Sequence, residues 1–217
     1  MTDEAVKTRT VGARRTATRR KVVDAALELW STRGFTTTTL QQVADAAGVH
    51  VQTIYLAFGT KAGLLAAVIE LARAGGEDEN NPPTRFPWVQ ELLATKDPAR
   101  KLRLYAGHVR RASPKGAPLV AVLRVAARDD PEIEAVRARY ADELYEGMKD
   151  LVRGLQDLDA LRADVDVDRA ADTLFTLTGT FQSYELLVGE RGWSPDEYER
   201  WLGDVLCDLL LARGVGD

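Results

Sequence analysis

The residue types that usually perform catalysis or bind metals are few in this chain and poorly spaced for either task. There are two histidines, His50 and His108, and one cysteine, Cys207. The sequence contains no Glu-x-x-His pair, no zinc-binding His-Glu-x-x-His, no phosphate-binding glycine loop and no Gly-x-Ser-x-Gly nucleophile motif. We therefore expect no catalytic site, no metal site and no bound cofactor, and a helical enzyme stays only as an alternative.

Three alternating aspartates, Asp164, Asp166 and Asp168, imitate the start of a calcium-binding loop. Such a loop needs glycine at its sixth position and glutamate at its twelfth. Those positions hold Arg169 and Phe175. The segment instead reads as a loop that ends where Asp166 or Asp168 caps a helix.

Charge is distributed unevenly along the 217 residues. The net charge of −4 arises from a segment 1–61 with nine basic and five acidic residues and from an acidic remainder. Residues 1–15 are polar and basic, and we expect a flexible arm there. A basic module on an acidic body suggests a nucleic-acid partner, although a basic tail alone is common.

Hydropathy and cysteine usage limit where the protein acts. No run of about 18 apolar residues exists, which predicts no membrane-spanning helix. The N-terminus lacks the apolar segment of a secretory signal. A lone cysteine cannot form an intramolecular disulfide, so we expect a cytoplasmic protein.

The pattern of apolar residues predicts an all-α fold. Apolar residues recur at helical spacing from about Thr16, and Gly34 suits the left-handed position that ends this helix. Later helices should begin at Asp97-Pro98, Asp130-Pro131 and Ser194-Pro195, where a side-chain oxygen precedes a proline. The Gly-, Pro- and acid-rich stretch 75–83 predicts a loop between the two parts of the chain.

The stretch from Thr36 to Lys61 predicts a helix-turn-helix. A helix capped by Thr38 or Thr39 is followed by the turn Ala47-Gly48-Val49 and a second short helix. A major groove about 12 Å wide accepts one such helix. Most helical hairpins only pack, however, so a structural or protein-interaction module remains an alternative.

The same stretch resembles the DNA-binding domain of the tetracycline-repressor (TetR) family. The resemblance covers residues 16–70 and includes Arg33-Gly34-Phe35, the glycine turn, Thr53-Ile54-Tyr55 and Lys61. It implies a three-helix DNA-binding domain over 16–61 and a larger helical domain for dimerisation and ligand binding over 62–217. The implied function is a DNA-binding transcriptional repressor, a homodimer released from a palindromic operator by a small-molecule effector. A regulator without a ligand switch is the alternative.

Site residues follow from this resemblance by position. It implies base contacts from Gln41, His50, Gln52 and Thr53, and phosphate contacts from Thr39, Tyr55 and Lys61. The chain departs from the family at Gln41, where arginine or a similar donor is frequent, and at Ala57, where tyrosine or histidine is usual. Ala57 cannot reach a phosphate, so one usual contact should be missing.

Two further sets of residues are expected in the acidic body. The helices expected at about 168–190 and 195–212 are apolar on more than one side, which suits a two-fold four-helix interface. Interface candidates are Leu174, Leu177, Tyr184, Leu187, Trp201 and Leu206. Ligand-pocket candidates are Trp88, Tyr105, His108, Arg124, Tyr140, Phe175 and Phe181, of which Tyr105 and His108 share a helix face.

Overall fold

The computed structural model describes residues 3–73 and 86–212, with side chains described for 16–71 and 86–212. It divides into two compact units, Met1–Leu71 and Ala72–Asp217. The regular elements of the described residues are all helical, apart from an isolated antiparallel bridge between Leu161 and Leu211, so the predicted all-α class is confirmed. No single described helix is long and apolar enough to cross a membrane.

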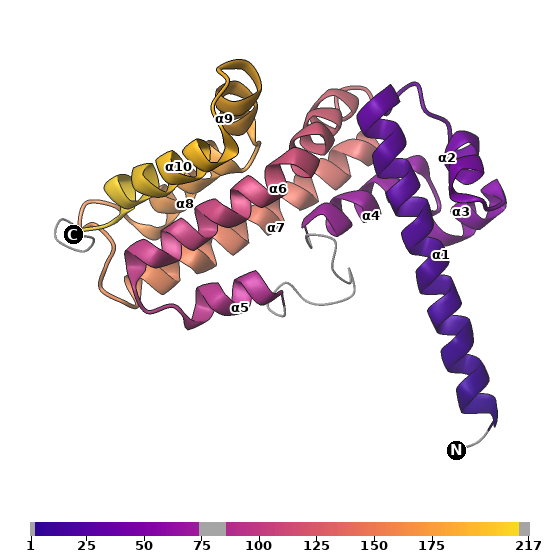
Figure 1. The fold of residues 1–217 in the computed structure, drawn as a ribbon, viewed down its shortest axis with the longest axis horizontal. Coiled ribbons are helices and arrows are strands. Elements are labelled where there is room, and N and C mark those ends of the chain that lie inside the picture. Colours follow the sequence, from indigo (N-terminus) through magenta and orange to yellow (C-terminus); the bar gives the residue numbers. More distant parts are fainter. Residues whose placement is uncertain (1–2, 74–85, 213–217) are drawn as a thin grey trace. The chain divides into compact units, whose positions relative to one another are not determined.

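The first unit consists of a long helix and three shorter ones (Figure 1). These are α1 (Asp3–Arg33), α2 (Leu40–Ala47), α3 (Val51–Phe58) and α4 (Lys61–Arg73). Gly34 has a φ of 88°, the left-handed conformation predicted for the end of α1. The core beneath α2 and α3 is formed by buried residues of all four helices, among them Val22, Val23, Trp30, Val43, Ala44, Ile54, Leu64, Leu65 and Val68.

The start of α1 differs from the expected flexible arm over residues 1–15. The backbone is helical from Asp3 onwards. Between Asp3 and Arg33 the sequence has no proline and a single glycine, Gly12, so no strong helix breaker interrupts the hydrogen-bonded ladder once it has formed. Most of α4 also groups with the first unit, whereas we expected the second part to begin at residue 62.

The second unit is built around two long helices that run side by side (Figure 1). Its elements are α5 (Pro87–Ala94), α6 (Pro98–Ala126), α7 (Pro131–Gln156), α8 (Val167–Thr178), α9 (Gln182–Tyr184), a π-helical segment (Glu185–Glu190) and α10 (Pro195–Leu210). Helix α10 packs on α6, and α8 packs on α7. Glycines ease the α6–α10 contact, since a Cβ at Gly203 would lie 3.1 Å from Cγ of Arg103.

The predicted helix starts are confirmed. Asp97, Asp130 and Ser194 each accept a backbone N–H of the helix that follows, with proline in the first turn. Ser194 also forms a capping box with Glu197. Of the alternatives left open, Thr39 caps α2 and Asp166 caps α8.

The continuous helix expected over about 168–190 is wrong, because α8 ends at Thr178. Phe181 adopts a left-handed backbone with φ 57°, and the chain continues through α9 and the π-helical segment. The ring of Phe181 lies against Gly116 of α6, where an added Cβ would be only 2.6 Å from the ring. Pro114 and Pro118 flank that glycine inside α6 and remove two backbone donors from it.

Candidate nucleic-acid interface

The turn between α2 and α3 is fixed by hydrogen bonds at the C-terminal end of α2, where the N–H of Val49 also donates to Ala44, and a separate cap fixes the start of α2. Thr39 and Gln42 form a capping box at the start of α2. Gly48 has a φ of 66°, and its N–H donates to the carbonyl groups of Ala44 and Asp45. A residue with a Cβ is disfavoured in that conformation, so glycine is needed for a turn this tight. The turn therefore sets the direction in which α3 leaves α2.

Helix α3 has one buried side and one exposed side. Ile54 is fully buried, and Val51 and Phe58 flank it at helical spacing with partial exposure. Successive residues of an α-helix turn by about 100°, so Gln52 and Leu56 each lie roughly 160° away from Ile54. Both are exposed. Burial of one side thus presents the opposite side to a binding partner.

Of the four residues expected to contact bases, Gln52 and Thr53 lie in α3, His50 precedes it, and Gln41 lies at the start of α2. Gln41, His50 and Gln52 are exposed and line one open hollow at the turn. Thr53 is half-buried, outside the lining of that hollow. The side-chain amide of Gln41 donates to Asp45 at 2.8 Å, which orients its carbonyl oxygen.

The three expected phosphate contacts differ in how free their side chains are. Thr39 is exposed but already accepts the N–H of Gln42. Tyr55 is 48% exposed. Lys61 is half-buried. Its Nζ donates a hydrogen bond to the carbonyl oxygen of Phe35 at 2.6 Å and lies 4.2 Å from the centroid of the Phe35 ring. Burial lowers the pKa of Lys61. Two of its three N–H groups remain for other partners.

Sequence reasoning missed two residues near this face. Leu56 is 83% exposed, and its spacing of four from Gln52 would have placed it on the outer side of α3. Arg19 of α1 donates to the carbonyl oxygen of Ala57 and lies 4.5 Å from the ring centroid of Phe58. No local sequence pattern predicts the contacts of Arg19 with Ala57 and Phe58, because they join residues far apart in the chain.

The exposed face of α2 and α3 carries no positive side chain of its own. Residues 34–60 contain neither lysine nor arginine. The basic residues of the first unit lie in α1 and at Lys61. The turn and α3 consequently offer hydrogen bonding and apolar surface rather than charge.

In the second unit, three of the expected pocket residues lie together. The ring of Trp88 on α5 stacks on His108 of α6, with centroids 3.5 Å apart and planes 13° apart. One turn earlier, the buried hydroxyl of Tyr105 is 2.9 Å from that of Thr178. Burial raises the pKa of Tyr105 and lowers that of His108 to about 4, so both side chains are neutral at pH 7.

Of the other expected pocket residues, Tyr140 lies near Tyr105, whose pKa it helps to raise. Phe181 covers Gly116, while Phe175 pairs with Tyr145 with centroids 6.0 Å apart. Tyr140 is half-buried and Arg124 is exposed. The structure therefore stacks Trp88 on His108 and places Tyr105 one turn earlier on α6, near Tyr140; it gives no reason to add Arg124 to them.

The expected interface residues divide into two groups. Leu174 and Leu206 are fully buried within their own subunit and cannot also cover a partner. The others, Leu177, Tyr184, Leu187 and Trp201, remain partly exposed. Two residues outside the expected set, Leu186 and Leu209, are 44% and 42% exposed near them in sequence.

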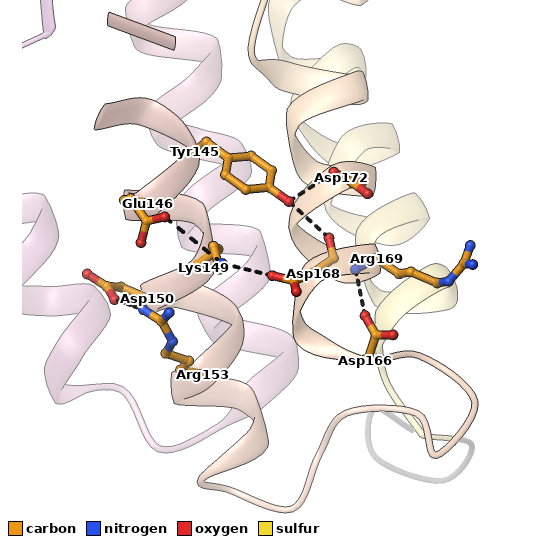
Figure 2. A network of polar contacts seen from close by, with 9 residues as sticks. All are labelled: Tyr145, Glu146, Lys149, Asp150, Arg153, Asp166, Asp168, Arg169 and Asp172. Atoms are coloured by element: carbon orange, nitrogen blue, oxygen red, sulfur yellow. Dashed lines mark hydrogen bonds and ion pairs between the residues drawn. The ribbon is translucent and has the colours of Figure 1, made fainter. Parts of the chain in front are cut away.

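The aspartates that imitate a calcium loop are engaged in structural contacts. Asp164 pairs with Arg162, and Asp166 caps α8. Figure 2 shows Asp168 paired with Lys149 of α7 at 2.8 Å, while the Tyr145 hydroxyl donates to Asp172. These contacts join α7 to α8.

Comparison with known proteins supports the resemblance in the first unit. Residues 22–68 match the family model "Bacterial regulatory proteins, tetR family". The HTH-type transcriptional regulator AcrR of Shigella flexneri is 38% identical over 71 residues, which are 32% of this chain and 33% of that protein. The chain thus matches about a third of the length of this curated relative.

Solved structures resemble the fold of nearly the whole chain. NalD of Pseudomonas aeruginosa, the secondary repressor of the MexAB-OprM multidrug efflux pump, has a TM-score of 0.68 at 23% identity and covers 92% of this chain and 99% of its own. A regulator of Saccharomonospora viridis in complex with choline has a TM-score of 0.66 at 20% identity, covering 90% and 98%. At sequence identities of 20% and 23%, these similarities show a shared fold.

Proposed function

We propose that this chain, in which residues 22–68 match the family model of the tetR bacterial regulatory proteins, is a transcriptional repressor released from its operator by a small molecule. The observation that carries the proposal is the exposed side of α3, held by a capped glycine turn and bordered by the hollow of Gln41, His50 and Gln52. Its polar groups suit the reading of base edges in a major groove.

Within this proposal, each polar residue has a defined chemical task. Gln52 can bind adenine through two hydrogen bonds, and His50 and Thr53 can donate to base acceptors. Thr39, Tyr55 and Lys61 hold phosphates, as do the backbone N–H groups at the start of α2. Gln41 reads a base with the carbonyl oxygen that its bond to Asp45 leaves free.

The proposed repressor is a two-fold dimer. Its interface includes partly exposed apolar and aromatic residues of the segment from α8 to α10, among them Leu177, Tyr184, Leu186, Leu187, Trp201 and Leu209. A two-fold axis would present α3 twice, to half-sites about 34–36 Å apart. The operator is then a palindrome.

The proposed effector site is the aromatic group of Trp88, Tyr105 and His108. These side chains are neutral at pH 7, and the indole nitrogen of Trp88 is buried with no hydrogen-bond partner among the described residues. An effector that accepts a hydrogen bond from this indole N–H would supply the partner that the described residues do not. Choline, present in one solved neighbour, is a natural first probe because aromatic faces attract quaternary ammonium groups.

Selection of bound sequences from a random duplex pool, followed by fluorescence anisotropy, tests DNA recognition. We expect a palindromic site whose log affinity falls linearly with log salt concentration. Gln52→Ala should weaken that site about ten-fold or more and leave random DNA nearly unchanged. Gln156→Ala, an exposed glutamine of α7, is the matched control. Equal losses on both DNAs for Gln52→Ala would refute base reading by that residue.

The ligand switch is tested separately on the selected operator. Choline and a panel of small aromatic compounds are screened for a rise in Tm, and each hit is added to the protein–operator complex. Release of DNA supports the switch, because a ligand acts only through different affinities for two shapes. Hits that raise Tm and leave operator affinity unchanged would indicate a regulator without a ligand switch.

A further inference from the structure

We propose that Leu56 reads a thymine of the operator by packing on its 5-methyl group, an inference that rests on the proposed function. Thymine is the one standard base that presents a methyl group in the major groove, so an apolar side chain there can select it. The proposal adds an apolar specificity contact to the polar ones described above.

The exposure of Leu56 is unusual for its chemistry. It is 83% exposed, the highest value among the exposed large hydrophobic side chains of the described residues. In the same helix Ile54 is fully buried. Leu56 therefore adds almost nothing to the packing of the first unit, and its burial against a partner remains available.

The position of Leu56 identifies the partner. Leu56 and Gln52 are four residues apart and lie side by side on the side of α3 opposite Ile54. If Gln52 faces base edges, Leu56 faces the next bases along the same groove. The flanking residues Thr53 and Tyr55 lie on the two sides of this ridge, towards the groove walls.

The chemistry of the surrounding surface favours a base over the backbone as the partner. Leu56 can neither donate nor accept a hydrogen bond, and the following residue, Ala57, is too short to reach a phosphate. No lysine or arginine occurs between residues 34 and 60 to compete for this part of the groove. A methyl group is the ligand that such a surface can recognise.

Replacement of thymine by deoxyuridine tests the contact, because it removes only the methyl group. Each thymine of the selected operator is replaced in turn, in both half-sites, and binding is measured by anisotropy. Wild-type protein should lose about four-fold in affinity per contact at one position, the equivalent of roughly 0.8 kcal/mol for a methyl group. Leu56→Ala should bind the thymine and uracil duplexes equally at that position.

Two variants control for other causes. Leu56→Met keeps an apolar side chain of similar volume and should retain the preference for thymine. Leu93→Ala removes another exposed leucine, 59% exposed on α5, and should behave as wild type. Far-UV circular dichroism confirms that the variants fold.

The outcomes separate this inference from the proposed function. If the wild-type protein selects no sequence from the pool, the proposed function fails. If it selects a site but no thymine shows a methyl preference that depends on Leu56, the inference is overturned and the proposed function stands. The second result includes the case in which Leu56→Ala weakens all duplexes equally, as expected for packing on the sugar–phosphate backbone.

Discussion

The junction of α3 and α4 leaves no room for a methyl group at Gly63. A Cβ there would overlap the carbonyl oxygen of Phe58 and lie 3.2 Å from its carbonyl carbon. These are backbone atoms of Phe58, so they cannot move aside by rotation of a side chain. Phe58 is the last residue of α3. Gly63→Ala must therefore displace the end of the helix that is proposed to enter DNA.

The magnitude follows from two opposing effects. Overpacking of a close contact costs about 1–3 kcal/mol, and the upper part of that range applies where backbone must move. Alanine is favoured over glycine in a helix by about 1 kcal/mol. The net expectation for Gly63→Ala is a loss of roughly 1–2 kcal/mol in the free energy of unfolding of the first unit, with weaker operator binding.

Gly147 provides the matched control. It lies inside α7, and a Cβ at this residue would meet nothing within 4 Å. Gly147→Ala should therefore stabilise the protein by up to about 1 kcal/mol. Urea unfolding, combined with hydrogen exchange of the α3 and α4 amides, measures both variants. A Gly63→Ala protein as stable as the wild type would refute the steric argument.

Two further predictions concern the second unit. His108 has a pKa of about 4 when folded and about 6.5 when unfolded, so the unfolded chain binds more protons between these values. The free energy of unfolding should fall by up to roughly 3 kcal/mol as pH drops from 6.5 to 4. Urea unfolding at several pH values should show a weaker pH dependence for His108→Gln than for the wild type. Equal pH dependence of the two proteins would contradict a lowered pKa of His108. Ser194→Ala removes the hydroxyl of the capping box and should lower the free energy of unfolding by about 1 kcal/mol in thermal unfolding experiments, whereas Ser31→Ala, at an exposed position of α1, should leave it unchanged.

Features set by neighbouring residues could be predicted from the sequence. The caps at Asp97, Asp130 and Ser194 depend on a side-chain oxygen and a proline that are adjacent in the chain. The tight turn at Gly48 likewise depends on one residue. Local hydrogen-bonding chemistry determines each of these, and the helix-turn-helix therefore followed from its spacing.

Features set by residues far apart in the chain could not be predicted. The stacking of Trp88 on His108 and the bond from Lys61 to Phe35 join separate elements. The end of α8 is another case, because the left-handed Phe181 satisfies a contact with α6 that its own neighbours do not reveal. Helical periodicity records which residues are apolar, but it does not say which of them meet.

The phenyl ring of Phe181 packs against Gly116, so two positions that are far apart in the sequence constrain one another. An added Cβ at Gly116 would lie 2.6 Å from Cε2 of Phe181 and 2.7 Å from its Cζ, so residue 116 cannot become larger while the phenyl ring stays in place. Chains descended from a common ancestor with this break in the helix should therefore keep the pair or exchange both, with a bulkier residue at 116 accompanied by a smaller one at 181.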